Sequence, residues 1–423
     1  MKTPRATFLH QYPGLICAVL GLVMLAGCKT PETGDALSSA ASSTAAKVGD
    51  ITVEENRVDV AILALFNQRA SITTDLEFAP LAGPAALAFR AADRTTLLQR
   101  AQTVGNKLWV NATQLAQQYH SMPLDDRVLY WRRLLEKREF KTACTNEKAD
   151  ALLCTEMLTV FERASRGASD LQFKTPKAAN NLHIVVSGFD PFGLDNHIDQ
   201  SNPSGAAALA LDGVQLKHNG LTAEIQAAMF PVRFADFDAG MVETIFEPLI
   251  TSGAIDMLVT ISMGRSEFDL ERFPGRRRSA TAPDNLRVRT GASGTKPLIP
   301  MLAGQPLDGP EFVEFSLPVT ALRRVQTPYP VNDNHTVTTL ESGEHDATNL
   351  AALRTQTAVR GSGGGYLSNE ISYRTVRLVR LHNADVAVGH IHTPRINAYD
   401  AQAVIAITKQ IRSMLTASLD SSQ

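Results

Sequence analysis

The first half of the chain carries apolar residues at the spacing of amphipathic helices. Between about Val53 and Arg166, apolar positions recur three and four residues apart, for example at Leu108, Ala112 and Leu115. This recurrence is the period of one helix face. We therefore expect an all-α accessory domain over residues 48–170, which packs on the next domain or acts as a spacer for it.

The second half alternates short β-branched runs with helical patterns, after a polar linker at 167–181. A helical pattern begins after Asp400, a good N-cap, and continues to Leu419. The alternation predicts an α/β domain over residues 182–419, with a mostly parallel sheet sandwiched by helices. The runs that predict strands are His183–Val186, Thr222–Phe230, Ile255–Ile261, Thr355–Val359 and Asp385–Ile391.

The N-terminus has the pattern of an export signal. Lys2 and Arg5 precede an apolar run that is short for a bilayer span and that closes on Leu-Ala-Gly-Cys at residues 25–28. This resembles a bacterial lipoprotein signal, which implies removal of residues 1–27 and a lipid anchor on Cys28. The alternative is an ordinary secretory signal in which Cys28 has no role.

Export is expected in either case. With Cys28 as the anchor, the membrane is a partner, the protein faces the periplasm, and Lys29 after the anchor favours the outer membrane over the inner. Residues 28–47 are rich in Ser, Ala and Thr without apolar periodicity, which predicts a flexible tether.

Composition and charge narrow the possible partners. The chain has 423 residues, of which 44% are hydrophobic and 20% charged, as is ordinary for a globular protein. Its formal net charge is −2, so it lacks the basic character of a nucleic-acid-binding protein. We expect no nucleic-acid partner and no cofactor.

Two cysteines remain after the signal region. Cys144 and Cys154 are ten residues apart, and disulfides persist in the oxidising compartment to which export leads. We expect a disulfide between them, with two free buried thiols as the alternative.

A glycine-rich turn places one serine at the start of an apolar, helix-compatible run. Gly361–Gly365 precedes Ser368 and a helical pattern that includes Ile371 and Tyr373. Glycines let a substrate approach the backbone, and the first N–H groups of a helix attract negative charge. Ser368 is therefore a candidate nucleophile, and the alternative is a loop whose serine only caps a helix.

Several motifs occur in a characteristic order across the second half of the chain. They are Ser187–Gly193, Asn202–Ser204, Gly264–Arg265, Leu270–Arg272, Pro283–Asn285, Gly309–Pro310, Leu317–Pro318, Gly364–Tyr373 and Gly389–Pro394. Together they resemble the pyroglutamyl peptidase I (pyrrolidone-carboxylate peptidase) family. The resemblance covers about residues 182–419 and implies an α/β sandwich. It also implies an exopeptidase that removes an N-terminal pyroglutamyl residue from peptides with Cys, His and Glu.

The resemblance assigns roles to individual positions. Glu271 and His392 match the catalytic glutamate and histidine, while Phe189 and Phe192 would form an apolar wall for the flat lactam ring. Ser368 occupies the place of the nucleophilic cysteine. Because a serine hydroxyl ionises far less readily than a thiol, it needs a base during attack. The substitution implies a triad of Ser368, His392 and Glu271.

Other departures affect specificity. Ile261 stands where many members of the family carry a substrate-binding glutamine, and it cannot donate a hydrogen bond. Thr281 replaces an arginine, for which the neighbouring 276–278 arginines could compensate, although such a run is most often a solvated loop. His390 and His392 would share one side of a strand, but no other ligand spacing accompanies them, so we predict no metal site.

Three hypotheses follow for function. The first is a hydrolase that acts on N-terminal pyroglutamyl or related groups. The second is a pseudoenzyme that binds peptides or cell-wall fragments without turnover. The third makes the helical region a scaffold that docks another envelope protein.

Overall fold

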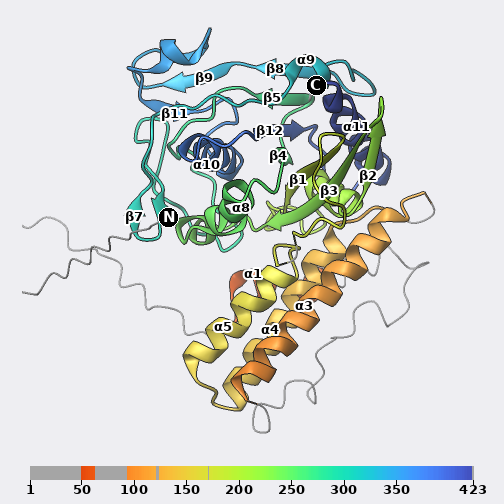
Figure 1. Ribbon diagram of the computed structural model, residues 1–423. Coiled ribbons are helices and arrows are strands. Elements are labelled where there is room, and N and C mark those ends of the chain that lie inside the picture. The colour runs from red at the N-terminus through yellow and green to blue at the C-terminus, as the bar shows by residue number, and fades with distance from the viewer. Residues whose placement is uncertain (1–48, 62–92, 121–122, 170, 422–423) are drawn as a thin grey trace, which may run out of the picture. The chain divides into compact units, whose positions relative to one another are not determined.

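The computed structural model describes residues 49–61, 93–120, 123–169 and 171–421 (Figure 1). The predicted signal peptide, the tether and Cys28 lie outside these ranges. None of the helices within the described ranges combines the length and the apolar character that a membrane span requires. Because Cys28 lies outside the described residues, the lipid anchor stays a prediction.

The region between residues 49 and 169 is helical where it is described. Side chains cap the N-termini of three of these helices. Thr52 and Glu55 form a capping box at the first, and Asp93 and Asp150 each cap another. A disulfide joins Cys144 near the end of one helix to Cys154 in the next, the pairing that the sequence predicts. The helices are α1 (Val53–Asn56), α3 (Arg94–Gln117), α4 (Arg127–Asn146) and α5 (Ala151–Ala164).

A seven-stranded sheet forms the centre of the second half, in the order β2-β3-β1-β4-β12-β5-β8. Neighbouring strands are parallel except in the pairs β2–β3 and β12–β5. The predicted α/β class with a mostly parallel sheet is thus confirmed. The strands are β1 (Asn181–Phe189), β2 (Gln215–His218), β3 (Leu221–Phe230), β4 (Met257–Met263), β5 (Phe268–Glu271), β8 (Val331–Asn334) and β12 (Ala387–Thr393).

Helices cover both faces of this sheet (Figure 1). One set packs α6 (Pro203–Leu211) against β1, β3 and β4, with α11 (Ala401–Ser418) beside it. The other set packs α10 (Leu367–Leu381) against β12 and β4, with α8 (Met241–Thr251) beside it. Strands β1 and β4 are buried along almost their whole length, which explains their continuous apolar runs. Short helices α7 (Phe234–Asp238) and α9 (Val319–Leu322) lie in the connections.

The structure corrects the predicted place of one strand. The run Thr355–Val359 contributes β11 (Ala358–Arg360), but this strand pairs antiparallel with β9 (Thr336–Thr339) in a separate sheet with β10 (Gly343–Asp346). The central sheet is completed instead by β5 and β8, whose sequences are Phe-Asp-Leu-Glu and Val-Asn-Asp-Asn. Asp and Asn are depleted in strands, so neither segment has a strand signature. A further small sheet pairs β6 (Met301–Leu302) with β7 (Gln305–Pro306).

The helical region and the sheet share one hydrophobic core. Apolar residues of α3 and α5 belong to the same buried cluster as those of β1, β3 and α6. Helix α3 packs directly against α6, and residues 47–423 form one compact unit. The helical region therefore packs on the α/β region and is not a spacer.

Candidate functional site

Glu271 and His392 form a buried pair at the ends of two neighbouring strands. Glu271 is the last residue of β5, and His392 lies next to the end of β12. The His392 Nδ1–H donates to Glu271 Oε1 over 2.5 Å. The other carboxylate oxygen, Oε2, accepts from the Asn334 amide at 2.8 Å. Both carboxylate oxygens are thus held, and a proton at Nδ1 leaves Nε2 as the acceptor nitrogen whenever the ring is neutral.

A glycine makes room for this histidine. A Cβ atom built on Gly264 would lie only 2.6 Å from His392 Cβ and 2.7 Å from its Cγ. The Gly264 N–H also donates to the Thr393 carbonyl at 2.9 Å. Any other residue at this position would push the ring away from its place beside Glu271.

Ser368 is the second residue of α10, directly after the glycine-rich turn. Gly364 has a φ of 89°, a conformation that residues with a side chain rarely adopt. The amide of Asn369 holds the turn against the chain after β5, since it accepts from Gly275 N–H at 2.9 Å and donates to Gly275 carbonyl at 2.7 Å. The Ser368 hydroxyl itself donates to the Gly363 carbonyl at 3.2 Å and not to His392.

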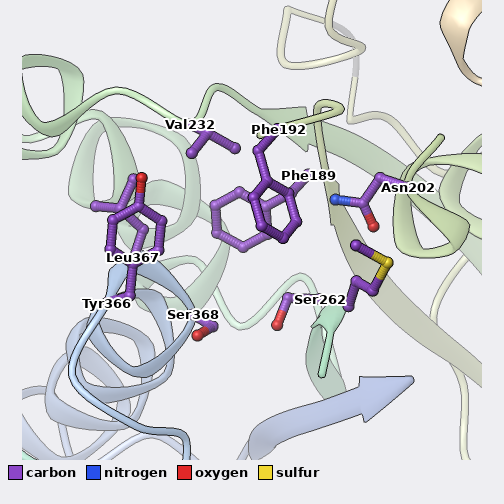
Figure 2. Close-up of a pocket in the computed structure, with 9 residues that line it drawn as sticks. Phe189, Phe192, Asn202, Val232, Ser262, Tyr366, Leu367 and Ser368 are labelled. Atoms are coloured by element: carbon purple, nitrogen blue, oxygen red, sulfur yellow. The ribbon is translucent and has the colours of Figure 1, made fainter. Parts of the chain in front are cut away.

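A pocket opens beside Ser368 (Figure 2). It encloses about 300 Å³ of empty space, part of which is open to solvent. Most of its wall is apolar. The Phe189 and Phe192 rings and the Ser368 side chain all line this pocket. The lining residues are Phe189, Phe192, Asn202, Val232, Ser262, Met263, Tyr366, Leu367 and Ser368.

Five of the predicted site residues lie at the pocket or next to it. Phe189, Phe192 and Ser368 line the pocket. Glu271 and His392 bond to each other, and His392 lies in register with the pocket residue Ser262 on the adjacent strand.

Ile261, predicted to contact the substrate, is fully buried and is not among the lining residues. Its neighbours Ser262 and Met263, at the end of β4, line the pocket instead, whereas Ile261 belongs to the hydrophobic core.

The sequence reasoning missed a second hydrogen-bonded histidine. His390 is fully buried, with Nδ1 at 2.8 Å from Thr260 Oγ1 and Nε2 at 2.7 Å from Ser262 Oγ. Its ring centroid lies 4.8 Å from that of His392. Burial is the main cause that lowers the pKa of His390 well below its ordinary value, with the neighbouring His392 adding to it. The sequence places hydroxyl residues at 260 and 262 and histidines at 390 and 392. Only the pairing of β4 with β12 shows that these residues are neighbours.

The arginines after β5 are paired rather than solvated. Arg278 is buried and binds both carboxylate oxygens of Glu370, at 2.6 and 2.9 Å. Glu370 also accepts from Arg374 at 2.9 Å. Arg276 and Arg277 both pair with Glu311. Because Glu370 is two residues after Ser368, its ion pairs fix the first turn of α10, and the prediction of a solvated loop is wrong.

No group of three or more His, Cys, Asp or Glu side chains able to hold a metal ion occurs within the described ranges.

Two family models match the chain. Residues 183–310 and 331–397 match the model of the "PA0049, C-terminal domain", and residues 35–162 match that of the "PA0049 N-terminal domain". Each of the two models thus matches a different part of the chain.

The uncharacterized protein PA0049 of Pseudomonas aeruginosa is 27% identical over 381 residues, which cover 70% of this chain and 69% of that protein.

Solved structures with a detectable likeness include pyrrolidone carboxyl peptidases of Pyrococcus furiosus. A structure of that enzyme and its Cys-free mutant has 17% identity and a TM-score of 0.41, and covers 57% of this chain and 100% of its own. One point mutant has 18% identity, the same share of this chain, 99% of its own and a TM-score of 0.40. Values this low say nothing about activity.

The helical region contacts the chain next to a lining residue of the pocket. Asp190 follows the lining residue Phe189, and its buried carboxylate contacts Arg133 Nη2 at 2.6 Å and Arg166 Nη1 at 2.8 Å. All three side chains are at most 1% exposed. The backbone between the two pocket phenylalanines is thus fixed by arginines from α4 and from just after α5.

A second contact of the helical region reaches another lining residue. Asp126, at the start of α4, accepts from the Ser201 hydroxyl at 2.5 Å and from the Asn202 N–H at 2.9 Å. Burial, with a contribution from the neighbouring Asp125, raises the pKa of Asp126 to about 7. Sequence reasoning missed these contacts, because Arg133 and Asp190 are 57 residues apart and neither belongs to a local motif.

Proposed function

We propose that this protein is an amide hydrolase of the pyroglutamyl-peptidase type. Its substrates are peptides that carry an N-terminal pyroglutamyl or related compact group, and Ser368, His392 and Glu271 perform the reaction. The observation that carries the proposal is the 2.5 Å bond between His392 Nδ1 and Glu271 Oε1, at the edge of a small apolar pocket that contains the Ser368 hydroxyl.

The buried carboxylate gives His392 the properties of a general base. A carboxylate that accepts from Nδ1–H fixes the tautomer with a free Nε2 and stabilises the imidazolium that forms when Nε2 takes a proton. Asn334 holds the second oxygen of Glu271, so the carboxylate does not turn away. This arrangement supplies what a serine nucleophile needs and a cysteine thiolate does not.

The reaction we propose has two steps. The Ser368 hydroxyl turns from the Gly363 carbonyl, gives its proton to His392 Nε2, and its oxygen attacks the amide carbon. The backbone N–H groups in the first turn of α10 face the developing negative charge. The carbon–nitrogen bond then breaks, and the proton moves from His392 to the leaving amine. Water, deprotonated by His392, hydrolyses the resulting ester and restores Ser368.

The test is hydrolysis of a fluorogenic pyroglutamyl amide by the purified chain. Ser368→Ala should reduce kcat by about a thousandfold or more, because removal of a nucleophile eliminates the covalent route. Ser372→Ala is the matched control, since Ser372 lies one turn further along α10 with a fully buried hydroxyl that has no hydrogen-bond partner in the described structure. Equal activity of Ser368→Ala and Ser372→Ala would exclude Ser368 as the nucleophile.

One observation favours a second candidate, a pseudoenzyme that binds such groups without turnover. The Ser368 hydroxyl donates to Gly363 and not to His392. If that bond persists when a ligand binds, no base reaches the serine. Binding of a pyroglutamyl peptide without any Ser368-dependent hydrolysis would select this candidate over the hydrolase.

A further inference from the structure

A directed chain of hydrogen bonds runs from the sheet into the pocket. The Thr260 hydroxyl donates to the Gly389 carbonyl at 3.2 Å. Its oxygen is therefore an acceptor toward His390 Nδ1, 2.8 Å away. His390 is fully buried, and its lowered pKa keeps the ring neutral. A neutral imidazole has one donor and one acceptor nitrogen, so a donor at Nδ1 makes Nε2 an acceptor.

The direction of this chain determines what Ser262 offers to a ligand. His390 Nε2 lies 2.7 Å from Ser262 Oγ, and as an acceptor it receives a hydrogen bond from the serine hydroxyl. In the described structure this is the hydrogen bond that the Ser262 hydroxyl makes. The oxygen keeps two lone pairs, and the side chain, 5% exposed, lines the pocket.

The other polar side chains at the pocket are largely occupied within the protein. The amide nitrogen of Asn202 donates to the Asp190 carbonyl, and its oxygen accepts from Ser204. The Tyr366 hydroxyl donates to the Pro283 carbonyl at 2.9 Å. No charged residue is among those that line the pocket.

We propose that Ser262 is a specificity-determining hydrogen-bond acceptor, which selects compact, uncharged ligands that present an N–H or O–H group to the pocket. His390 is its positioning residue, since it accepts the hydrogen bond of the serine hydroxyl and so leaves the serine oxygen as an acceptor for the ligand. A site built to hydrogen-bond a ligand group discriminates against an analogue that lacks it, because the buried partner is left unpaired. The inference rests on the proposed function only in taking this pocket as the substrate site.

The experiment compares two ligands that differ in one atom. L-Pyroglutamamide has a ring N–H, and its lactone analogue has an ester oxygen in the same position. Equilibrium dissociation constants are measured for both with the full chain carrying Ser368→Ala, so that neither ligand is turned over. We expect the lactam to bind about tenfold more tightly, the scale of one partly buried hydrogen bond.

Adding Ser262→Ala should bring the two dissociation constants within about twofold of each other, whereas Ser262→Thr, which keeps the hydroxyl, should retain the preference. His390→Phe should also weaken the preference, because the serine hydroxyl is then free to turn and donate. Thermal unfolding checks that each variant is folded. A merely structural role of His390 would lower affinity for both ligands equally.

The proposal is overturned if the lactone binds as tightly as the lactam or more tightly, if the preference survives Ser262→Ala, or if neither ligand binds. Hydrolysis by the chain with Ser368 intact is measured separately. A lactam preference that depends on Ser262, together with no hydrolysis, would refute the proposed catalysis and leave the acceptor role standing. Hydrolysis without a lactam preference would refute the acceptor role of Ser262 and leave the proposed catalysis standing.

Discussion

Two buried polar clusters lie near the pocket, and they differ in the groups that they bring together. The proposed catalytic cluster consists of Glu271, His392 and Asn334, in which both carboxylate oxygens are bonded and His392 Nε2 is the proposed base. The interface cluster consists of Arg133, Arg166 and Asp190, where one carboxylate contacts two guanidinium groups. The first is proposed to act on the substrate, and the second holds the chain beside Phe189.

This difference predicts separate consequences for substitution. Loss of an atom that acts on the transition state lowers kcat, with little effect on folding. Loss of one partner from a buried ion pair leaves a charge without compensation, and that lowers the free energy of unfolding. The two clusters should therefore be separable by measuring rate and stability in the same variants.

The largest effect is expected at His392. His392→Ala removes the proposed base, and kcat should fall by about a thousandfold to ten-thousandfold. His390→Ala, two residues away on the same strand, should change kcat by about tenfold at most, because that ring acts on Ser262 and not on the nucleophile. Steady-state kinetics on a pyroglutamyl amide measure both. An equal loss of kcat in the two variants would remove the distinction between the histidines.

The next largest effect is expected at the interface cluster. Arg133→Met should lower the free energy of unfolding by about 3–5 kcal/mol, because the Asp190 carboxylate stays buried with one partner fewer. KM should rise more than kcat falls, since Asp190 supports the pocket phenylalanines.

Arg138→Met is the control for this interface variant. Arg138 is on the same helix, but it pairs with Asp59, which is 72% exposed. Such a surface pair contributes about 0–1 kcal/mol. Urea unfolding of both variants makes the comparison, and an equal loss of stability would show that burial of the pair at Arg133 is not what matters.

A smaller, pH-dependent effect is expected at Asp126. Its pKa is raised to about 7 in the folded chain, so the folded state binds more protons than the unfolded state between about pH 4 and 7. Stability should therefore be highest at the acid end of this window, fall as the pH rises to about 7, and change no further from this group above it. The loss is at most about 4 kcal/mol.

Asp126→Asn removes this titration while keeping an acceptor for Asn202. The free energy of unfolding, measured at pH 4.5 and pH 8, should differ less in Asp126→Asn than in the unsubstituted chain. An identical difference in both proteins would mean that Asp126 does not titrate in this window. Because the comparison is between two proteins at the same pH values, other titrating groups cancel.

Much of the fold was predictable because its signals are local. Continuous apolar runs marked β1, β3, β4 and β12, and Asp400 marked the start of α11. The two short polar strands, β5 and β8, were not predictable, because their Asp and Asn residues are poor strand formers. They are strands because pairing with β12 satisfies the backbone of β5, which in turn pairs with β8.

For the candidate site, the sequence by itself indicated Ser368, His392 and Glu271 through their motifs. Local signals also marked α10 and β12, which carry Ser368 and His392, but not β5, which carries Glu271. The sequence also placed Cys144 and Cys154 at a spacing that a disulfide spans.

Only the tertiary structure decided what surrounds these residues. Ser262, and not Ile261, lines the pocket, and the pairing of β4 with β12 brings Ser262 within hydrogen-bond distance of His390. Packing of α4 on the sheet brings Arg133 to Asp190. Strand register and the pairing of buried charges depend on contacts between segments far apart in the chain, and no local pattern of residues encodes them.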